Sequence, residues 1–392
     1  MSKEQKTILL CGHDGYIGNA FLQRLLNSGY KVFAVDNLMR RRWIFEEMKS
    51  MSATKQDPYR TYLLEKMGNV AIYNFDISKD IYPLESILSE NEISTVINLA
   101  HIPSGPYSQK SRQHANTTLI NNIIGTNNIL WLMKKHIPYA HYITIGSTGE
   151  YDHYSNIPIY EGYCKMKWKD RISNEMIFPR RPGSIYHTSK VASTYLIDFI
   201  AKAWDLKCTD IMQSIVFGMY TDDIDKSKIW SRLDSDEAGG TVIHRFVVQA
   251  ILDIPLTIYG EGFHQRGFIS LNDSIQALMI AMSNEAKPGR VQVWNQLSEW
   301  HSINNITSMV IEVGNELGLH VLKQYIPSPR NEYTGKHFYN YKTNILKRFG
   351  YKPTREIKEE IRYMFENLLP RKDELNPLRK VVMPKIKWDN KE

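Results

Sequence analysis

The sequence predicts an α/β protein built on a doubly wound parallel sheet, followed by a smaller C-terminal lobe of mixed α/β structure. Short apolar runs alternate with helical stretches through the first half of the chain, which is typical of strand–helix–strand units. A glycine-rich segment follows the first apolar run, and from about residue 218 the segments become shorter and mixed. We therefore expect a nucleotide-binding domain over residues 1–217 and a second lobe over 218–392, some of whose segments return to the first domain.

Each expected element follows from its local pattern. Apolar runs predict strands over Thr7–Cys11, Lys31–Val35, Val70–Asn74, Thr95–Leu99, His141–Ile145 and Thr209–Ile215. Helices are expected over Tyr16–Asn27, Leu119–Lys135 and Tyr186–Trp204. Two stretches interrupt the alternation, residues 43–67 and 152–184, and we interpret both as insertions. The later segments are Val242–Leu252, Leu256–Ile258, Phe268–Ile269, Asp273–Met282, Val291–Trp294 and Ile303–Leu317, and the charged ending 371–392 is expected to be a partly ordered tail.

Composition restricts the class of protein. A chain of 392 residues with 42% hydrophobic and 23% charged residues has the composition of a soluble globular protein. It contains no apolar run near the roughly 18 residues of a membrane span, and its first residues are polar, so neither a membrane segment nor a signal peptide is expected. The three cysteines are scattered, which indicates neither a disulfide framework nor a metal site and favours a reducing cytoplasm. The net charge of +7 is spread along the chain, apart from Arg40–Arg42 and the stretch 165–181, and it carries no nucleic-acid-binding signature. We therefore expect a basic surface or anionic substrates, and no nucleic-acid partner.

The glycine-rich segment predicts a dinucleotide site of the Rossmann type. Gly12, Gly15 and Gly18 provide a tight turn, close approach of the backbone to a diphosphate, and close packing of helix on strand. Asp36, at the end of the second expected strand, can accept hydrogen bonds from an adenosine ribose and would repel a 2′-phosphate. It therefore favours NAD over NADP, although the nearby Arg40–Arg42 could neutralise such a phosphate. Asp76 and Ile77, at the end of the third strand, are expected to reach the adenine.

A hydroxyl and a Tyr-x-x-x-Lys pair predict redox chemistry at the same edge of the sheet. Ser147 ends the fifth expected strand, and Tyr186 and Lys190 lie four apart on an expected helix, so their side chains share one face. An ammonium beside a phenol favours the phenolate, which would let Tyr186 act as a base near neutral pH. The spacing alone is common on helix surfaces, and the upstream glycine loop gives it significance.

These motifs together resemble the extended short-chain dehydrogenase/reductase proteins, whose helix motif is matched by residues 121–126, with Asn122 expected near the lysine. Further motifs resemble the UDP-sulfoquinovose synthase family: Gly149-Glu150-Tyr151, Glu161-Gly162-Tyr163, Tyr186-His187, Ala203-Trp204, Arg232-Leu233-Asp234, Arg245-Phe246, Pro255-Leu256-Thr257, Arg266-Gly267 and Met383-Pro384. The resemblance covers nearly the whole chain and includes both insertions.

The resemblance implies a reaction. Tightly held NAD oxidises carbon 4 of UDP-glucose, water leaves from carbon 6, sulfite (or sulfite from a donor) adds to the resulting 5,6-ene, and carbon 4 is reduced again. Tyr186 is expected to be the base for the 4-hydroxyl, Ser147 replaces the family's threonine, and a homodimer is expected by analogy. The related 4,6-dehydratases carry an Asp-Glu pair where this chain has Thr148-Gly149, so Glu150 and His187 are the candidates for the carbon 5 and 6 steps.

The loop and the resemblance together imply cofactor contacts from Gly12, Gly15, Tyr16, Ile17, Gly18, Asp36, Asn37, Leu38, Arg40, Asp76, Ile77, Leu99, Ala100, Asn122, Tyr186, Lys190 and Phe217. They imply substrate contacts from Ser147, Thr148, Tyr186, Gln213, His244, Arg245, Thr257, Tyr259, Arg266 and Arg330. Arg266 and Arg330 suit a diphosphate because a guanidinium group binds phosphate oxygens in pairs. No metal is expected.

Two departures leave alternatives open. His101-Ile102-Pro103 stands where plant members of the family have Glu-Gln-Arg, and His244 replaces an asparagine beside Arg245. A 4-epimerase or 4,6-dehydratase acting on another nucleotide sugar is the alternative enzyme. A non-catalytic NAD-sensing protein is the alternative from another class, and the presence of Ser147, Tyr186 and Lys190 opposes it.

Overall fold

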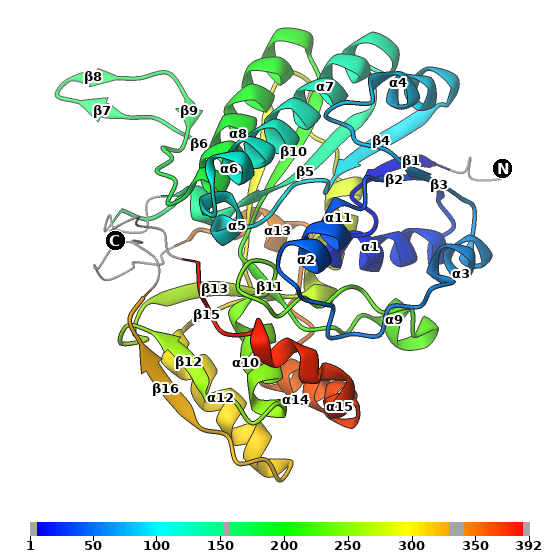
Figure 1. Cartoon of the computed structure of the whole chain (residues 1–392). Helices are drawn as coiled ribbons and strands as arrows, with labels where there is room; N and C mark the ends of the chain where they lie inside the picture. The colour runs from blue at the N-terminus through cyan, green and yellow to red at the C-terminus, as the bar shows by residue number, and fades with distance from the viewer. Residues whose placement is uncertain (1–5, 152–156, 329–340, 387–392) are drawn as a thin grey trace.

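A seven-stranded parallel sheet organises the molecule (Figure 1). The computed structural model describes residues 6–151, 157–328 and 341–386, and within them the strand order is β14-β10-β5-β4-β1-β2-β3. The strands are β1 (Thr7–Cys11), β2 (Lys31–Asp36), β3 (Val70–Asn74), β4 (Ile93–Asn98), β5 (His141–Ser147), β10 (Lys207–Gln213) and β14 (Val291–Gln296). The order runs outward in both directions from β1, so the predicted doubly wound α/β fold is confirmed.

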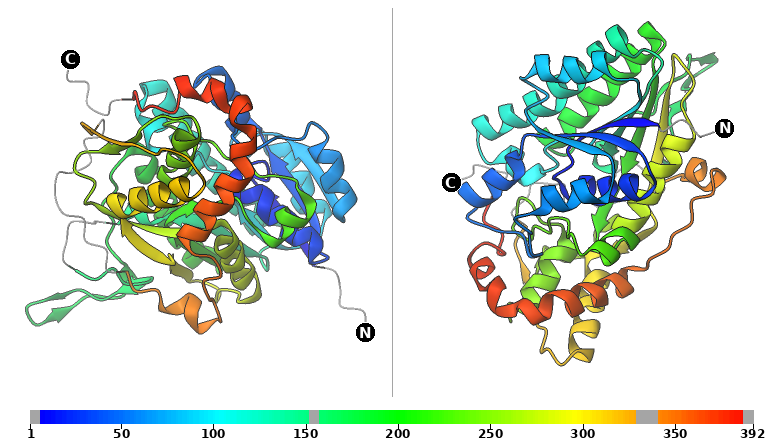
Figure 2. Two further views of the ribbon diagram at one scale, coloured as in Figure 1. Left: turned by 90° about the horizontal axis from the view of Figure 1, so that it is seen from below. Right: turned by 90° about the vertical axis from the view of Figure 1, so that its right-hand side faces the viewer.

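Helices cover both faces of this sheet, as the views in Figures 1 and 2 show. On one face, α4 (Ile81–Glu90), α7 (Gly125–His136) and α8 (Ile185–Trp204) pack on buried side chains of β4 and β5. On the other, α1 (Tyr16–Asn27), α3 (Arg60–Met67) and α11 (Leu271–Ser283) bury their apolar residues. Because both faces are covered, β1 is an apolar run in which Ile8, Leu9 and Leu10 are fully buried.

The expected helix over Leu119–Lys135 has a different form. The chain is continuously helical from α6 (Arg112–Leu119) through a π-helical turn over Ile120–Ile124 into α7. A π-helical turn widens the helix locally, and such turns concentrate at functional sites. Here it contains Asn121 and Asn122, which face the loop after β4.

The second lobe has its own buried core, separate from those beside the sheet. Its elements are β11 (Ile215–Phe217), α10 (Val242–Ile251), β12 (Leu256–Tyr259), β13 (Gln265–Ser270), β15 (Glu299–Ser302), α12 (Ile303–Glu316), β16 (Lys323–Ile326) and α14 (Ile357–Leu368). Two later helices, α9 (Asp222–Ser227) and α13 (Asn344–Arg348), pack instead beside the central sheet, where Ile224 and Leu346 are buried. The part of the charged ending within the described residues includes α15 (Lys372–Leu375), and Leu375, Leu378 and Val382 are fully buried in the lobe core.

The two insertions differ in form. The first contains the end of α2 (Met39–Glu46) and all of α3, and it bonds to the second lobe: the amide of Ala53 donates to the carbonyl of Leu233 (2.8 Å), and the Thr54 hydroxyl donates to the carbonyl of Ser231 (2.6 Å). The second insertion forms two short antiparallel pairs, β6 (Tyr163–Cys164) with β9 (Met176–Ile177) and β7 (Lys167–Trp168) with β8 (Arg171–Ile172). The β7–β8 hairpin projects from the body, as Figure 1 and the left view of Figure 2 show.

Among the helices of the described residues, none is long and apolar enough to cross a membrane. A further short helix, α5 (Gly105–Gln109), follows β4 and packs beside α8.

Candidate active site

A cavity of about 1280 Å³ lies at the carboxyl edge of the central sheet and is lined by both lobes. Most of the predicted site residues line it, although they come from widely separated parts of the chain. They are Gly12, Gly15, Tyr16, Ile17, Gly18, Asp36, Asn37, Arg40, Ile77, Leu99, Ala100, Ser147, Thr148, Tyr186, His187, Lys190, Gln213, His244, Arg245, Tyr259 and Arg266.

Six predicted residues lie outside the lining: Leu38, Asp76, Asn122, Glu150, Phe217 and Thr257. Phe217 and Thr257 are fully buried in the second lobe, where the phenyl ring of Phe217 meets that of Phe268 edge-on. Leu38 and Asp76 serve turns, since Leu38 precedes α2 with a φ of 54° and Asp76 accepts hydrogen bonds from Ser78. Asn122 holds the loop after β4 by exchanging hydrogen bonds with the backbone of Ile102. Arg330 lies outside the described residues.

The glycine loop has the close contacts that a dinucleotide cradle needs. Gly12 has a φ of +89°, and a Cβ there would lie 2.6 Å from the carbonyl carbon of Leu99. A Cβ at Gly18 would lie 1.9 Å from the carbonyl oxygen of Gly12, so helix α1 can approach the turn only with glycine at this position. The amide groups at the start of α1 and the Asp36 carboxylate beside them form a donor and acceptor set that fits NAD.

Asp36 itself is held by backbone amides. Its carboxylate oxygens accept hydrogen bonds from Asp14 (3.0 Å) and Leu38 (2.7 Å). Burial, reinforced by the charge of Asp14, raises the pKa of Asp36 to about 6. The position is therefore fixed before any ligand contact, and the ionisation of the group depends on pH within a physiological range.

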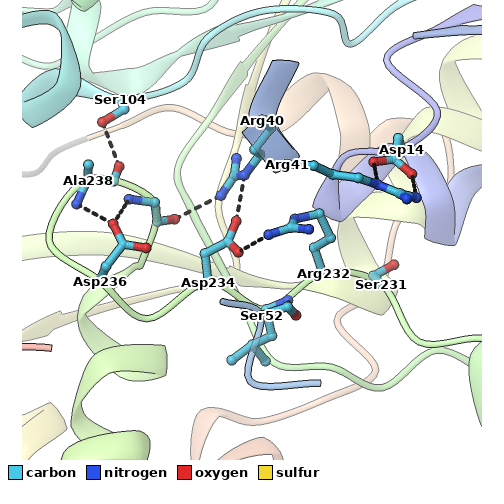
Figure 3. A network of polar contacts seen from close by, with 12 residues as sticks. Asp14, Arg40, Arg41, Ser52, Ser104, Ser231, Arg232, Asp234, Asp236 and Ala238 are labelled. Carbon is cyan, nitrogen blue, oxygen red and sulfur yellow. Dashed lines mark hydrogen bonds and ion pairs between the residues drawn. The ribbon is translucent and has the colours of Figure 1, made fainter. Parts of the chain in front are cut away.

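The arginines near Asp36 bind carboxylates and carbonyls of the protein (Figure 3). Arg40 donates to Asp234 (2.7 Å) and to the carbonyl of Gly239 (2.9 Å), and Arg42 donates to the carbonyl of Asn37 (3.2 Å). Arg41 makes a two-bond pair with Asp14 in the glycine loop. These bonds leave the expectation of NAD intact, because each arginine of the run already has an acceptor within the protein.

Asp14 is also paired with an arginine of the first insertion. The Arg60 guanidinium lies 2.9 Å from the Asp14 carboxylate, and both side chains are almost fully buried, at 4% and 3% exposed. Burial opposes ionisation, but the hydrogen bond from Arg41 and the charge of Arg60 outweigh it and lower the pKa of Asp14. The glycine loop is thus held from outside by α2 and by the insertion.

Residues of the segment 231–240 line the cavity near Arg40, and the polar contacts of this segment are drawn in Figure 3. Asp234 accepts hydrogen bonds from Arg40 and from Arg232 (2.9 Å), and Asp236 accepts from the amides of Ala238 and Gly239. The Ser104 hydroxyl donates to the carbonyl of Ala238 (2.6 Å). This segment of the second lobe is therefore attached to α2 and to the loop after β4.

The predicted reaction centre consists of Ser147, Tyr186, His187 and Lys190. At this centre, β5 ends in a capped turn. The Ser147 hydroxyl accepts a hydrogen bond from the amide of Gly149 (3.1 Å), while the amide of Ser147 donates to the Glu150 carboxylate (2.8 Å). Tyr186, in the first turn of α8, is 9% exposed. Burial and the charge of Glu150 raise the pKa of Tyr186, and a hydrogen bond with Ser147 opposes this rise.

Lys190 bridges the loop after β4 and the end of β5, and its effect on the pKa of Tyr186 stays a prediction. Its ammonium group donates to the Nδ1 atom of His101 (2.5 Å) and to the carbonyl of Ile145 (2.6 Å). The Nε2 atom of His101 lies 3.1 Å from the hydroxyl of Thr126, which itself donates to the carbonyl of Asn122. His101 Nε2 must therefore carry the proton, so Nδ1 is the acceptor for Lys190.

His187 occupies the space beside Gly149. Its Nδ1 atom bonds the hydroxyl of Ser184 (2.9 Å), the residue that caps α8, and its ring lies 4.8 Å from that of Tyr186 between centroids. A Cβ built on Gly149 would lie only 2.1 Å from His187 Nε2. A side chain at position 149, such as the glutamate of the 4,6-dehydratases, is therefore incompatible with this position of the histidine.

Glu150 lies beneath the cavity wall, which corrects its assignment as a group that contacts substrate. It is fully buried, and its second oxygen lies 3.1 Å from the hydroxyl of Thr194, which donates a hydrogen bond to Asp210 (2.7 Å). Burial raises the pKa of both carboxyl groups, and the charge of Arg180 opposes the rise. Glu150 is thus a positioning residue for Ser147 rather than an acid or base at the substrate.

The second lobe contributes the polar groups of the opposite wall. Arg245 donates to the hydroxyl of Tyr259 (2.5 Å) and to the carbonyl of Thr257 (3.0 Å). Gln213 donates to Ser274 and Gln296, and Arg266 donates to the carbonyl of Gln265. His244 meets the ring of Tyr16 edge-on at 5.2 Å, and burial lowers its pKa to about 4. Gln213, Arg245, Tyr259 and Arg266 thus line one cavity with the reaction centre.

Sequence comparison places this site in a known family. Residues 8–295 match the model of the NAD dependent epimerase/dehydratase family. The chain is 36% identical to the UDP-sulfoquinovose synthase of Sulfolobus acidocaldarius over 388 residues, which is 97% of each chain. It is 32% identical to the chloroplastic UDP-sulfoquinovose synthase of Spinacia oleracea over 98% of this chain and 79% of the spinach protein. The chain belongs to the UDP-sulfoquinovose synthase family. Membership confirms the resemblance found in the sequence and the expectation of NAD as the cofactor.

Solved structures support the fold assignment of this synthase-family chain. A UDP-glucose 4-epimerase from Thermotoga maritima, in complex with UDP-glucose, superposes with a TM-score of 0.69 over 93% of this chain and 99% of the epimerase, at 20% identity. The TM-score is 0.68 for a UDP-glucuronic acid 4-epimerase from Bacillus cereus, in complex with UDP-glucuronic acid and NAD, over the same shares of both chains and at 21% identity. At these identities the similarity establishes the shared fold alone.

Several site residues were not among the predicted ones. Asp14 lies between two glycines of the loop, and this position in the sequence could have identified it as a site residue. Asp234 belongs to the Arg232-Leu233-Asp234 motif, to which no role had been assigned. Arg60 and Asp210 had no local signal, because their partners Asp14 and Thr194 are 46 and 16 residues away in sequence.

Proposed function

We propose that this protein is a UDP-sulfoquinovose synthase, which makes UDP-sulfoquinovose from UDP-glucose and sulfite with NAD that is regenerated in each cycle. The observation that carries the proposal is the similarity over nearly the whole chain to two proteins of that name, insertions included. The position of His187 against Gly149 supports it further, since it distinguishes this reaction centre from one with an Asp-Glu pair.

The residues around carbon 4 have the chemistry that the first stage needs. Bound NAD would accept a hydride from carbon 4 and later return it. The Tyr186 oxygen would take the proton of the 4-hydroxyl, and the Ser147 hydroxyl, fixed by the turn that ends β5, would hold the oxygen. Lys190 would orient the nicotinamide ribose, and Gly12, Gly15, Gly18 and Asp36 would hold the rest of the cofactor.

His187 is the group that we assign to the proton transfers at carbons 5 and 6. Its ring lies next to Tyr186 and against Gly149, on the wall of the cavity, whereas Glu150 is one layer below. A carbon 5 proton is acidified once carbon 4 is a ketone, and an imidazole can serve both to remove this proton and to protonate the leaving 6-hydroxyl.

The second lobe would bind the nucleotide. Arg245 and Arg266 offer guanidinium groups for the diphosphate, Tyr259 a ring and hydroxyl near the uridine, and Gln213 an amide at the end of β10. Arg330 remains a prediction, since it lies outside the described residues.

We also propose a homodimer formed through α7 and α8. Trp131 of α7 is 51% exposed, and Tyr195 and Phe199, four apart on one face of α8, are 47% and 67% exposed. Large apolar side chains gathered on two adjacent helices are typical of a surface buried between subunits. A cytoplasmic location is proposed with it, supported by three cysteines that form no disulfide.

The test is incubation with UDP-glucose, with and without sulfite, followed by mass spectrometry of the sugar nucleotide. A synthase gives a sulfite-dependent gain in mass corresponding to replacement of the 6-hydroxyl by a sulfonate. Conversion to UDP-galactose would instead identify a 4-epimerase, loss of water alone a dehydratase, and no conversion a binding protein.

A further inference from the structure

The second insertion ends beside the reaction centre with two consecutive arginines, Arg180 and Arg181, whose surroundings differ. Arg180 is directed into the protein: its guanidinium lies 4.1 Å from the ring centre of Tyr151 and near the buried carboxylates of Glu150 and Asp210. Arg181 lines the cavity. Successive side chains of an extended segment point to opposite sides, which accounts for the difference.

The backbone fixes where Arg181 lies. Its amide donates a hydrogen bond to the carbonyl of Glu150 (2.8 Å), the last residue of the turn that begins at Ser147. Gly149, the preceding residue of that turn, is in contact with the ring of His187. Arg181 is therefore attached to the same turn that contributes Thr148 and Gly149 to the cavity wall, next to the group assigned to carbons 5 and 6.

The other lysine and arginine side chains of the described cavity wall lie elsewhere. They are Arg40, Lys190, Arg232, Arg245 and Arg266. Arg40 and Arg232 bind Asp234 on the cofactor side, and Lys190 binds His101 and the end of β5. Arg245 and Arg266 belong to the second lobe, on α10 and β13. Arg181 is thus the arginine of this wall that is hydrogen-bonded through its backbone to the turn carrying Ser147 and Thr148.

From this arrangement we propose that Arg181, with Thr148 and His187, forms the binding site for sulfite. The proposal rests on the proposed function, because it places the second substrate of that reaction. A guanidinium group binds two oxygens of a small oxyanion and leaves the sulfur lone pair free to react. The insertion would thereby deliver the nucleophile to the side of the sugar where water has left.

The step balances without a further reagent. The sulfur lone pair forms the bond to carbon 6 of the 4-keto-5-ene, and the electrons of the carbon 5–carbon 6 double bond move to the carbon 4 oxygen as an enolate. A proton then adds to carbon 5, and the ketone is restored. His187, which removed a proton from carbon 5 in the earlier step, is placed to return one.

The inference is tested by steady-state kinetics of Arg181→Gln and Arg181→Lys with sulfite and UDP-glucose varied in turn. Loss of a charged hydrogen-bonding partner predicts a rise of about tenfold or more in the KM for sulfite in Arg181→Gln, with partial recovery in Arg181→Lys. The KM for UDP-glucose should change by much less. Arg171→Gln, in the exposed β7–β8 hairpin of the same insertion, is the matched control and should match the wild type.

Three results would overturn the inference. One is an unchanged KM for sulfite in Arg181→Gln, and another is an equal rise in both KM values, which would indicate a general effect on the cavity. The third is a wild-type protein without any sulfite-dependent product, which would overturn the proposed function and this inference with it. The formation of NADH from bound NAD and UDP-glucose alone, read at 340 nm in each variant, distinguishes the last case from the first two.

Discussion

The two ends of the cavity use charge in different ways. At the cofactor end, charged groups of the wall are paired with one another, as Asp14 is with Arg41 and Arg60, and Asp234 with Arg40 and Arg232. At the reaction centre, hydroxyl and ring groups line the wall together with Lys190 and Arg181, and the carboxylates of Glu150 and Asp210 lie one layer below it. The cofactor end thus uses ion pairs to fix its shape, whereas the reaction centre keeps its carboxylates away from the cavity.

The largest expected effect is at the reaction centre. Tyr186→Phe removes the proton acceptor but preserves the ring, so turnover should fall by roughly 10²–10⁴-fold while the bound NAD remains. Rate measurements and the absorbance of released cofactor would check both parts. Equal losses of turnover and of bound NAD would contradict the division between the two ends.

At the cofactor end, Asp14→Asn should act on the fold. It leaves the guanidinium of Arg60, only 4% exposed, without a charged partner, and the free energy of unfolding should fall by about 3–5 kcal/mol. Urea unfolding would measure this, and loss of bound NAD should accompany it. Asp222→Asn, which alters a pair with Arg24 at a side chain 56% exposed, is the matched control and should cost at most about 1 kcal/mol.

His187→Ala tests whether His187, on the cavity wall, transfers the protons at carbons 5 and 6. We expect carbon 4 to be oxidised still, so NADH should accumulate while product formation falls by roughly 10²-fold. Absorbance at 340 nm and mass spectrometry follow the two stages separately. A comparable accumulation of NADH in His136→Ala, a histidine at the end of α7 remote from the cavity, would argue against a role at carbons 5 and 6.

The smallest expected effect is a pH dependence of NAD binding. Burial raises the pKa of Asp36 to about 6, and its carboxylate form is the one proposed to accept hydrogen bonds from the ribose hydroxyl groups, so the affinity for NAD should fall about tenfold from pH 7 to pH 5. The raised pKa of Asp36 also affects the stability of the fold. Its stabilising contribution is fully present when the pH is below 3.8, the pKa of Asp36 in the unfolded chain, and is lost as the pH rises through about 6, its pKa in the folded chain. Acidification should therefore weaken NAD binding and strengthen the contribution of Asp36 to folding.

Calorimetric titration of NAD at both pH values, with Asp36→Asn as control, would test this prediction. The variant should bind NAD weakly at both values, and an unchanged pH dependence in it would assign the titration to another group.

The parts of the fold with strong local patterns were predictable from sequence. Helix α1 begins and ends at the expected residues, Tyr16 and Asn27, because the glycine loop marks its start and a periodic apolar face defines its length. The charged ending was harder to predict: Leu375, Leu378 and Val382 look isolated among lysines and arginines, and only the core of the second lobe explains their burial.

The candidate site also contains residues that the sequence could identify and residues that it could not. Ser147, Tyr186 and the glycines are recognisable because their chemistry depends on spacing within short segments. Glu150 was misassigned because its sequence neighbours lie on the cavity wall, and only the three-dimensional structure places its carboxylate below, beside Thr194 and Asp210. The partners of Arg40 and Arg41 also depend on residues distant in sequence.

The position of β14 has a consequence for biosynthesis. This strand pairs with β10 at the edge of the sheet, yet the chain first builds β11, α10 and much of the second lobe before reaching it. On the ribosome, β10 must wait for this partner on the order of ten seconds at about 5–20 residues per second. During that interval its unpaired edge can be joined by a foreign strand. A nascent chain of this protein is thus most in need of a chaperone when about three quarters of it has been translated.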